Sequence, residues 1–137
     1  MAKQNIKMRK AYRQGELLFV SLNQQDREKL ETEPNAPSYS RWSKLSTNVL
    51  REGEATGHKH EVMSRTPASV TLIAPARQFI GGLPDMDFVG TEDRLLVTAE
   101  PAEIAHPEHN TLRLPKGSYL VVVQREYDEV RARRVRD

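Results

Sequence analysis

The sequence has no cysteine and no long hydrophobic run, and aromatic residues make up only 6% of its 137 residues. The absence of cysteine excludes disulfides and thiolate metal sites, so any metal ion would need nitrogen or oxygen ligands. No segment approaches the roughly 18 apolar residues that cross a bilayer, and the basic start of the chain lacks the hydrophobic stretch of a signal peptide. We therefore expect a soluble, cytoplasmic protein without a membrane partner.

The net charge is only +2, but the charges are unevenly distributed. Residues 1–13 carry five basic side chains and no acid, and residues 131–136 carry four arginines. A chain of this length is expected to form one domain, so we predict a short basic arm over residues 1–12 and a single β domain over residues 13–137. The basic ends predict contact with a nucleic acid, unless they are simply solvated tails.

Short segments rich in Val, Leu and Ile, bounded by turn residues, predict an all-β fold. The clearest strands are expected at residues 16–22, 69–74, 94–99 and 118–124, and weaker ones at 48–52, 58–63, 78–80 and 131–135. Residues 119–123 are apolar on both alternating faces, which predicts a central strand. Residues 26–33 lack an apolar stripe and are expected to form one turn or a loop. The pattern favours a compact β-barrel or sandwich, for which a homodimer through edge strands is one expectation.

All four histidines fall in two short clusters, His58 with His60 and His106 with His109. On a strand, His58 and His60 would share one face about 6.6 Å apart. Pro107 is typical of a turn, which would bring the alpha carbons of His106 and His109 within about 7 Å. Imidazoles bind divalent metals such as Zn, Fe, Mn or Ni, so we predict one shared metal site. A metal-free site for acid–base chemistry or phosphate contact, and two unconnected clusters, are the alternatives.

Other side chains near these clusters are candidates for chemistry. Glu54 and Glu103 are carboxylates close in sequence to the histidines and are predicted to act as a general acid or base. Arg125 and Tyr127 follow the predicted central strand and are candidates for contacting a substrate. A structural ion pair is the other interpretation of Arg125.

Two resemblances bear on this site. HxH at residues 58–60, followed by PxG at residues 115–117, resembles the cupin family of small β-barrels, which implies a metal held inside the barrel by histidines and a carboxylate. The chain also resembles a group of small uncharacterised bacterial and phage proteins that share RQG-D/E, EGExTGHxH and HxEHxxxxLPxGxYxVxxQREY. These motifs match residues 13–16, 52–60 and 106–127 in that order. The second resemblance implies a site without naming a reaction.

Three functions from different classes fit these residues, and the sequence does not decide whether the protein is an enzyme. The first is a metal-dependent enzyme that acts on a small or nucleotide-like substrate through an open coordination position. The second is a structural or binding module in which four histidines close a tetrahedral site. The third is an accessory nucleic-acid-binding protein that uses the basic ends, with binding that weakens steeply with salt.

Overall fold

Two antiparallel sheets carry nearly all the regular structure in the computed structural model, which describes residues 10–32, 42–53, 56–75, 79–80 and 88–124. The six-stranded sheet has the order β1 (Ala11–Gln14), β2 (Leu17–Leu22), β12 (Gly117–Val123), β9 (Arg94–Thr98), β6 (Val70–Pro75), β3 (Trp42–Leu45). The four-stranded sheet has the order β11 (Leu112–Leu114), β10 (Ala102–Ala105), β5 (Lys59–Met63), β4 (Val49–Glu52). A two-stranded ribbon pairs β7 (Phe79–Ile80) with β8 (Phe88–Val89), and one short 3-10 turn spans Pro67–Ser69.

The main core lies between the two sheets, because alternate residues of each strand point inward. Buried side chains from both sheets form one cluster: Leu17, Phe19, Leu50, Val62, Leu72, Leu96, Ala102, Ile104, Leu114, Tyr119, Val121 and Val123. A second cluster lies on the other face of the six-stranded sheet and is built from Leu18, Val20, Leu22, Leu95, Leu120 and Val122. Strands buried on both faces read as continuous apolar runs, which is why β2 and β12 have little polar alternation.

The predicted all-β class is confirmed, and the two sheets form an open sandwich rather than a closed barrel. The four clearest strands are present as β2, β6, β9 and β12, and β12 is central because β2 and β9 pair with its two edges. The weaker predictions at 48–52, 58–63 and 78–80 correspond to β4, β5 and β7. The predicted strand at 131–135 lies outside the described residues. Residues 11 and 12, which the sequence assigned to the arm, form the start of β1.

The expectation of a loop at residues 26–33 is wrong, because α1 (Gln24–Thr32) is a helix of nine residues. Its N-terminus is closed by a reciprocal pair of hydrogen bonds. The Asp26 backbone N–H donates to Asn23 Oδ1 at 2.8 Å, and the Asn23 backbone N–H donates to Asp26 Oδ2 at 3.0 Å. Such a capping box stabilises a helix without an apolar stripe. In the part of the chain that the structure describes, no helix is both long and apolar enough to span a membrane.

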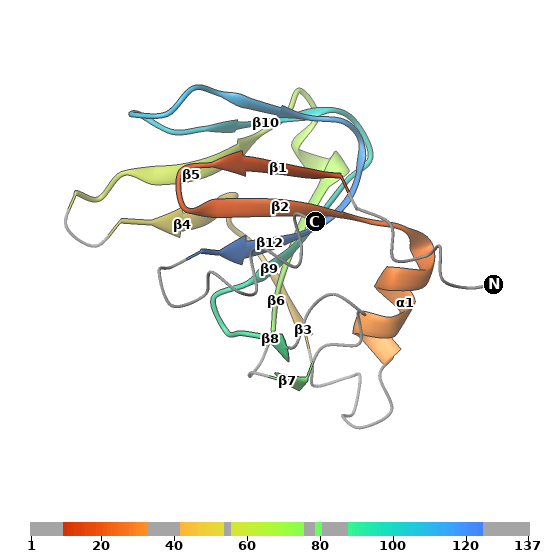
Figure 1. Cartoon of the computed structure of the whole chain (residues 1–137). Coiled ribbons are helices and arrows are strands. Elements are labelled where there is room, and N and C mark those ends of the chain that lie inside the picture. The colour runs from red at the N-terminus through yellow and green to blue at the C-terminus, as the bar shows by residue number, and fades with distance from the viewer. Residues whose placement is uncertain (1–9, 33–41, 54–55, 76–78, 81–87, 125–137) are drawn as a thin grey trace.

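Three hairpin turns lie at one end of the sandwich, at the left of the view in Figure 1. They connect β1 to β2, β4 to β5, and β10 to β11. The order of the strands explains this, because β10 pairs with both β5 and β11, while β1 lies beside β11. Turns that are far apart in the sequence therefore meet at this end.

Candidate functional site

The four histidine rings gather at the end where these three turns meet. The ring centroids of His60 and His106 are 4.3 Å apart, and those of His106 and His109 are 4.5 Å apart. His60 and His109 are nearly parallel at 6.0 Å, and His58 meets the edge of His106 at 5.8 Å. The structure therefore brings all four predicted histidines into one group, which we call the histidine cluster.

The β4–β5 turn holds His58 and directs His60 inward. Gly53 N–H donates to the carbonyl of His58 at 2.8 Å, and Gly57, with a φ of +74°, donates to the Gly53 carbonyl at 2.9 Å. The backbone N–H of His58 donates to Thr56 Oγ1 at 3.1 Å. Two residues further along β5, His60 faces the core and is only 1% exposed. A buried imidazole needs partners for both ring nitrogens.

Gln14 supplies the partner for one nitrogen of His60. Its Oε1 lies 2.8 Å from His60 Nδ1, and its Nε2 donates to the backbone carbonyls of Ile104 at 2.7 Å and Asn110 at 2.9 Å. Carbonyl oxygens only accept, so the amide NH₂ must face them and the amide oxygen must face His60. The Nδ1 atom of His60 therefore carries a proton and donates it.

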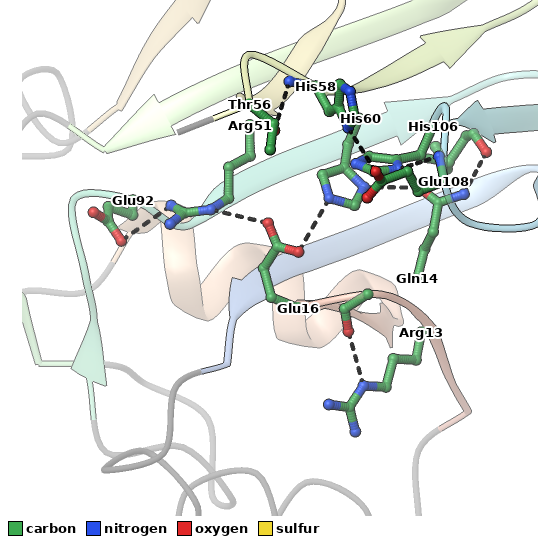
Figure 2. A network of polar contacts seen from close by, with 12 residues as sticks. Arg13, Gln14, Glu16, Arg51, Thr56, His58, His60, Glu92, His106 and Glu108 are labelled. Atoms are coloured by element: carbon green, nitrogen blue, oxygen red, sulfur yellow. Dashed lines mark hydrogen bonds and ion pairs between the residues drawn. The ribbon is translucent and has the colours of Figure 1, made fainter. Parts of the chain in front are cut away.

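Glu16 faces the other nitrogen of His60. Its Oε1 lies 3.3 Å from His60 Nε2, while its Oε2 lies 3.2 Å from Arg51 Nε. Arg51 in turn contacts Glu92 at 3.4 Å. Figure 2 shows this row of polar contacts running from Glu92 through Arg51 and Glu16 to His60. Gly15, which separates Gln14 from Glu16, has a φ of +59° and makes the tight turn that lets both side chains reach one imidazole.

Burial and neighbouring charges shift the protonation of this group. Burial lowers the pKa of His60, and repulsion from His106 and His109 acts the same way, against attraction to Glu16. Burial opposes ionisation of Glu16, but a hydrogen bond from its own backbone and attraction to His60 and Arg51 outweigh it and lower its pKa. The charged ring can donate from Nε2 to Glu16 Oε1, and this hydrogen bond acts against the lowering of the His60 pKa by burial. In the neutral ring with its proton on Nδ1, the lone pair of Nε2 faces Glu16 Oε1 instead.

The β10–β11 turn is arranged differently. His106 Nδ1 accepts a hydrogen bond from the backbone N–H of Glu108 at 3.0 Å, so its neutral ring carries the proton on Nε2. Burial and the nearby rings of His109 and His58 lower the pKa of His106. The carboxylate of Glu108 lies 3.4 Å from His58 Nδ1. The two atoms are not oriented for a hydrogen bond, and buried Nδ1 has no hydrogen-bond partner among the described residues.

An open groove of about 410 Å³ lies beside the histidine cluster. His58 and His106 line it together with Lys59, Glu61 and Thr111. Larger hollows of about 550 and 810 Å³ lie at the other end of β5, around Met63, and contain no histidine. Of these three hollows, the groove is the one with histidine rings in its wall, which makes it the relevant opening.

No group of three or more His, Asp or Glu side chains within the described ranges already has its donor atoms converged as a metal site. Two pairs of a histidine nitrogen and a carboxylate oxygen have the spacing of paired ligands, His60 with Glu16 at 3.3 Å and His58 with Glu108 at 3.4 Å. Tetrahedral zinc ligands at about 2.0–2.2 Å from the ion lie about 3.4 Å from each other, close to the 3.3 Å between Glu16 Oε1 and His60 Nε2. The other rings would need to rotate to complete a site.

Of the predicted carboxylates and substrate contacts, Glu103 lies within the described residues, and it does not join the cluster. Glu103 is exposed and pairs across β10 with Met63 and Arg113, on the outer face of the four-stranded sheet. Glu54, Arg125 and Tyr127 lie outside the described residues, as do most of the basic arm and the basic C-terminal end.

Sequence reasoning missed the two most closely placed partners of His60, Gln14 and Glu16. The available signal was the RQGE segment at residues 13–16, which was noted only as part of a family resemblance. The pairing that brings these residues to His60 joins positions 44 to 46 apart, and no local pattern predicts such a contact.

The chain belongs to the family described as Domain of unknown function (DUF8820), whose match covers residues 13–124. That range includes the histidine cluster and all of its described partners. No curated protein and no solved structure matches the chain.

Proposed function

We propose that this domain binds one divalent transition-metal ion at the histidine cluster and that the ion serves a reaction on a small-molecule substrate. The observation that carries the proposal is the pair formed by Glu16 Oε1 and His60 Nε2, 3.3 Å apart and beside the rings of His106 and His109. A carboxylate oxygen and an imidazole nitrogen at this distance need a proton or a metal ion between them. A metal-binding histidine usually donates its other ring N–H to an outer partner, and Gln14 accepts that bond here.

His106 and His109 are the nearest further ligands. Their rings lie 4.3 and 6.0 Å from His60 by centroid, within reach of an ion bound to His60 after modest rotation. His106 would give up its hydrogen bond from the Glu108 backbone, a loss of about 0.5–1.5 kcal/mol. Metal binding to structural zinc sites contributes about 10–16 kcal/mol, so this loss is small in comparison. The ligand set proposed is therefore Glu16, His60, His106 and His109.

Glu16 supplies a carboxylate ligand that the sequence did not predict, since Glu54 and Glu103 were predicted as a general acid or base. Three imidazoles and one carboxylate have the donor types that the cupin resemblance implies, and the RQGE, HxH and HxEH segments of the second resemblance contain all four ligands. Such a set suits Zn, Fe, Mn or Ni. When bound, the ion would supply Lewis-acid polarisation or an activated water.

The position of His58 favours an enzyme over a closed structural site. His58 lies at the rim of the cluster, where it meets the edge of His106 and the carboxylate of Glu108, and its side chain is 33% exposed. A site closed by four histidines would need His58 as a ligand. With Glu16 in the ligand set instead, His58 is left at the rim, and His106 is the proposed ligand that also lines the groove. A homodimer, a nucleic-acid partner and a cytoplasmic location remain predictions.

The test is elemental analysis of protein purified without a histidine tag, followed by titration of the metal-free protein with Zn²⁺ and Co²⁺. We expect about one ion per chain, loss of binding in His60→Ala and at least tenfold weaker binding in Glu16→Gln. Glu100→Gln is the matched control, because Glu100 precedes β10 at the end opposite His106, and should bind as the wild type does. A folded wild type that binds neither ion would refute the proposal.

The visible spectrum of the Co²⁺-loaded protein tests whether the ion is open to a substrate. Azide should change the spectrum if the ion has an exchangeable position on the groove side. His58→Ala should retain the ion in that case. A spectrum insensitive to azide, together with metal loss in His58→Ala, would favour the structural module with four histidine ligands.

A further inference from the structure

Gln14 is a buried polar residue on an edge strand with every side-chain hydrogen-bonding group engaged. It is only 3% exposed. Both amide hydrogens go to backbone carbonyls, those of Ile104 and Asn110, and the amide oxygen faces His60 Nδ1. Buried amides without partners are strongly disfavoured, so this arrangement constrains the groups around it as well as Gln14 itself.

The orientation of the amide has only one satisfactory solution. If it were rotated by half a turn, its oxygen would face two carbonyl oxygens and its NH₂ group would face His60. Both amide hydrogens would leave their acceptors, and the carbonyls of Ile104 and Asn110 would lose their donors. The observed orientation presents an acceptor to His60 Nδ1 at 2.8 Å, whereas the acceptor facing Nε2 is Glu16 Oε1 at 3.3 Å, so the shorter contact favours a neutral ring with its proton on Nδ1.

We propose that Gln14 is a positioning residue that locks His60 in the tautomer with the proton on Nδ1 and so presents the Nε2 lone pair toward Glu16. Gln14 fixes this tautomer in the metal-free protein, before any ion binds. Gln14 also joins two parts of the site, because Ile104 lies on β10 just before the turn that carries His106, and Asn110 follows His109. The consequence for metal affinity rests on the proposed function, whereas the tautomer does not.

The tautomer can be observed in the metal-free protein by long-range ¹H–¹⁵N correlation NMR of the histidine rings. At a pH where the imidazoles are neutral, we expect His60 to show a protonated Nδ1 and an unprotonated Nε2. His106 should show the opposite pattern, because its Nδ1 accepts from the Glu108 backbone. A wild-type His60 with its proton on Nε2 would overturn the proposal without any variant.

Two variants of Gln14 test whether this residue is the cause. Gln14→Met removes the acceptor at similar length, and we expect His60 to become a mixture of tautomers. Gln14→Glu restores an acceptor for Nδ1 but not the donors to Ile104 and Asn110, and should recover the Nδ1 proton if it folds. In Gln14→Met the affinity for Zn²⁺ should fall by about 10–100-fold, the usual effect of losing an outer hydrogen-bond partner.

Asn48→Ser is the matched control for a purely structural effect. The Asn48 amide donates to the Val62 carbonyl at 3.0 Å, at the opposite end of β5 from His60. This variant should lower the melting temperature while leaving the His60 tautomer unchanged. A His60 tautomer that is the same in Gln14→Met as in the wild type would refute the positioning role. If the tautomer changes as expected but wild type binds no Zn²⁺, Gln14 still has this role and only the proposed metal function fails.

Discussion

The two halves of the histidine cluster differ in how firmly they are held. In the fixed half, formed by Gln14, Glu16 and His60, a buried imidazole has both nitrogens facing partners on the β1–β2 turn. In the adjustable half, formed by His58 and residues 106–109, the rings are more exposed and the only hydrogen bond to a ring nitrogen comes, within the described part of the chain, from the local backbone of Glu108.

This difference suits a site that must bind an ion and also admit a ligand. The fixed half holds two metal-ligating atoms, Glu16 Oε1 and His60 Nε2, in position before the ion binds. This reduces the reorganisation needed on binding. The adjustable half faces the groove and can change ring orientation at the cost of one local hydrogen bond. A substitution in one half can therefore be compared with a substitution in the other half for its effect on stability or metal binding.

The largest effect is expected from removing the central ring of the fixed half. His60→Leu keeps a side chain of similar size but leaves Gln14 Oε1 buried without a donor. The free energy of unfolding of the metal-free protein should fall by about 1–3 kcal/mol, and metal binding should be lost. His58→Ala, in the adjustable half, should change stability by no more than about 0.5 kcal/mol. Urea unfolding checks both values, and equal destabilisation by the two variants would remove the distinction between the halves.

A smaller effect on stability is expected from substituting Gly15, which lies next to His109, where the two halves are in contact. A Cβ at Gly15 would lie 2.6 Å from His109 Nε2, whereas at Gly57 the nearest atom would be Glu52 Oε2 at 3.8 Å. Both glycines have positive φ, so Gly15→Ala and Gly57→Ala should each lose about 1–2 kcal/mol of stability.

The matched glycine pair separates backbone strain from the contact with His109. Only Gly15→Ala should displace the His109 ring, seen as a change in its NMR shifts, and weaken Zn²⁺ binding. If both variants bind Zn²⁺ equally well, His109 is not a ligand in the position that the structure indicates.

Acidification should destabilise the metal-free protein through His60 and Glu16 in the fixed half and through His106 in the adjustable half. The pKa of His60 is lowered by burial, against an ordinary value of about 6.5, so below that value the unfolded chain binds a proton that the folded protein does not. The stabilisation that comes from the neutral His60 ring is therefore fully present above pH 6.5. It is lost as the pH falls toward the pKa of His60 in the folded protein. The lowered pKa of Glu16 acts in the same direction at lower pH.

Urea unfolding of chelator-treated protein at several pH values measures this dependence. His60→Leu should have a shallower loss of stability between pH 7.5 and pH 5 than the wild type, as the ring that resists protonation is gone, while His58→Ala should follow the wild type. Stability that rises as the pH falls through this range would show that His60 is held as a cation in the folded protein.

The smallest effect is expected from substituting Arg51, which contacts Glu16 and Glu92 at the end of the polar contacts away from His60. Arg51→Lys keeps the charge but loses the planar group that contacts both Glu16 and Glu92, and its side chain is 27% exposed. Stability should change by less than about 1 kcal/mol, while Zn²⁺ affinity should fall by up to about tenfold because Glu16 is less firmly oriented. Arg65→Lys, next to Met63 at the other end of β5, should leave affinity unchanged. Equal affinity in the two variants would mean that Arg51 has no part in orienting Glu16.

Much of the fold could be predicted from local patterns. The continuous apolar run at residues 119–123 predicted the central position of β12, and the apolar segments at 16–22 and 94–99 predicted the strands that the structure places beside it. The sequence missed five short strands: β1, β3, β8, β10 and β11. Each has few apolar residues, and β10 and β11 flank the turn that contains Pro107. The helix α1 was missed because a capping box, rather than an apolar stripe, stabilises its start.

The sequence by itself determined where the four main strands lie, where the glycine turns fall and which two segments carry the histidines, because these features depend on local backbone preferences and on the pattern of apolar residues. Only the tertiary structure decided that Gln14 and Glu16 face His60 while Glu103 points away. That choice depends on which strands become neighbours and on which face each side chain emerges. Both follow from burying the whole core at once, so no segment of the chain determines them alone.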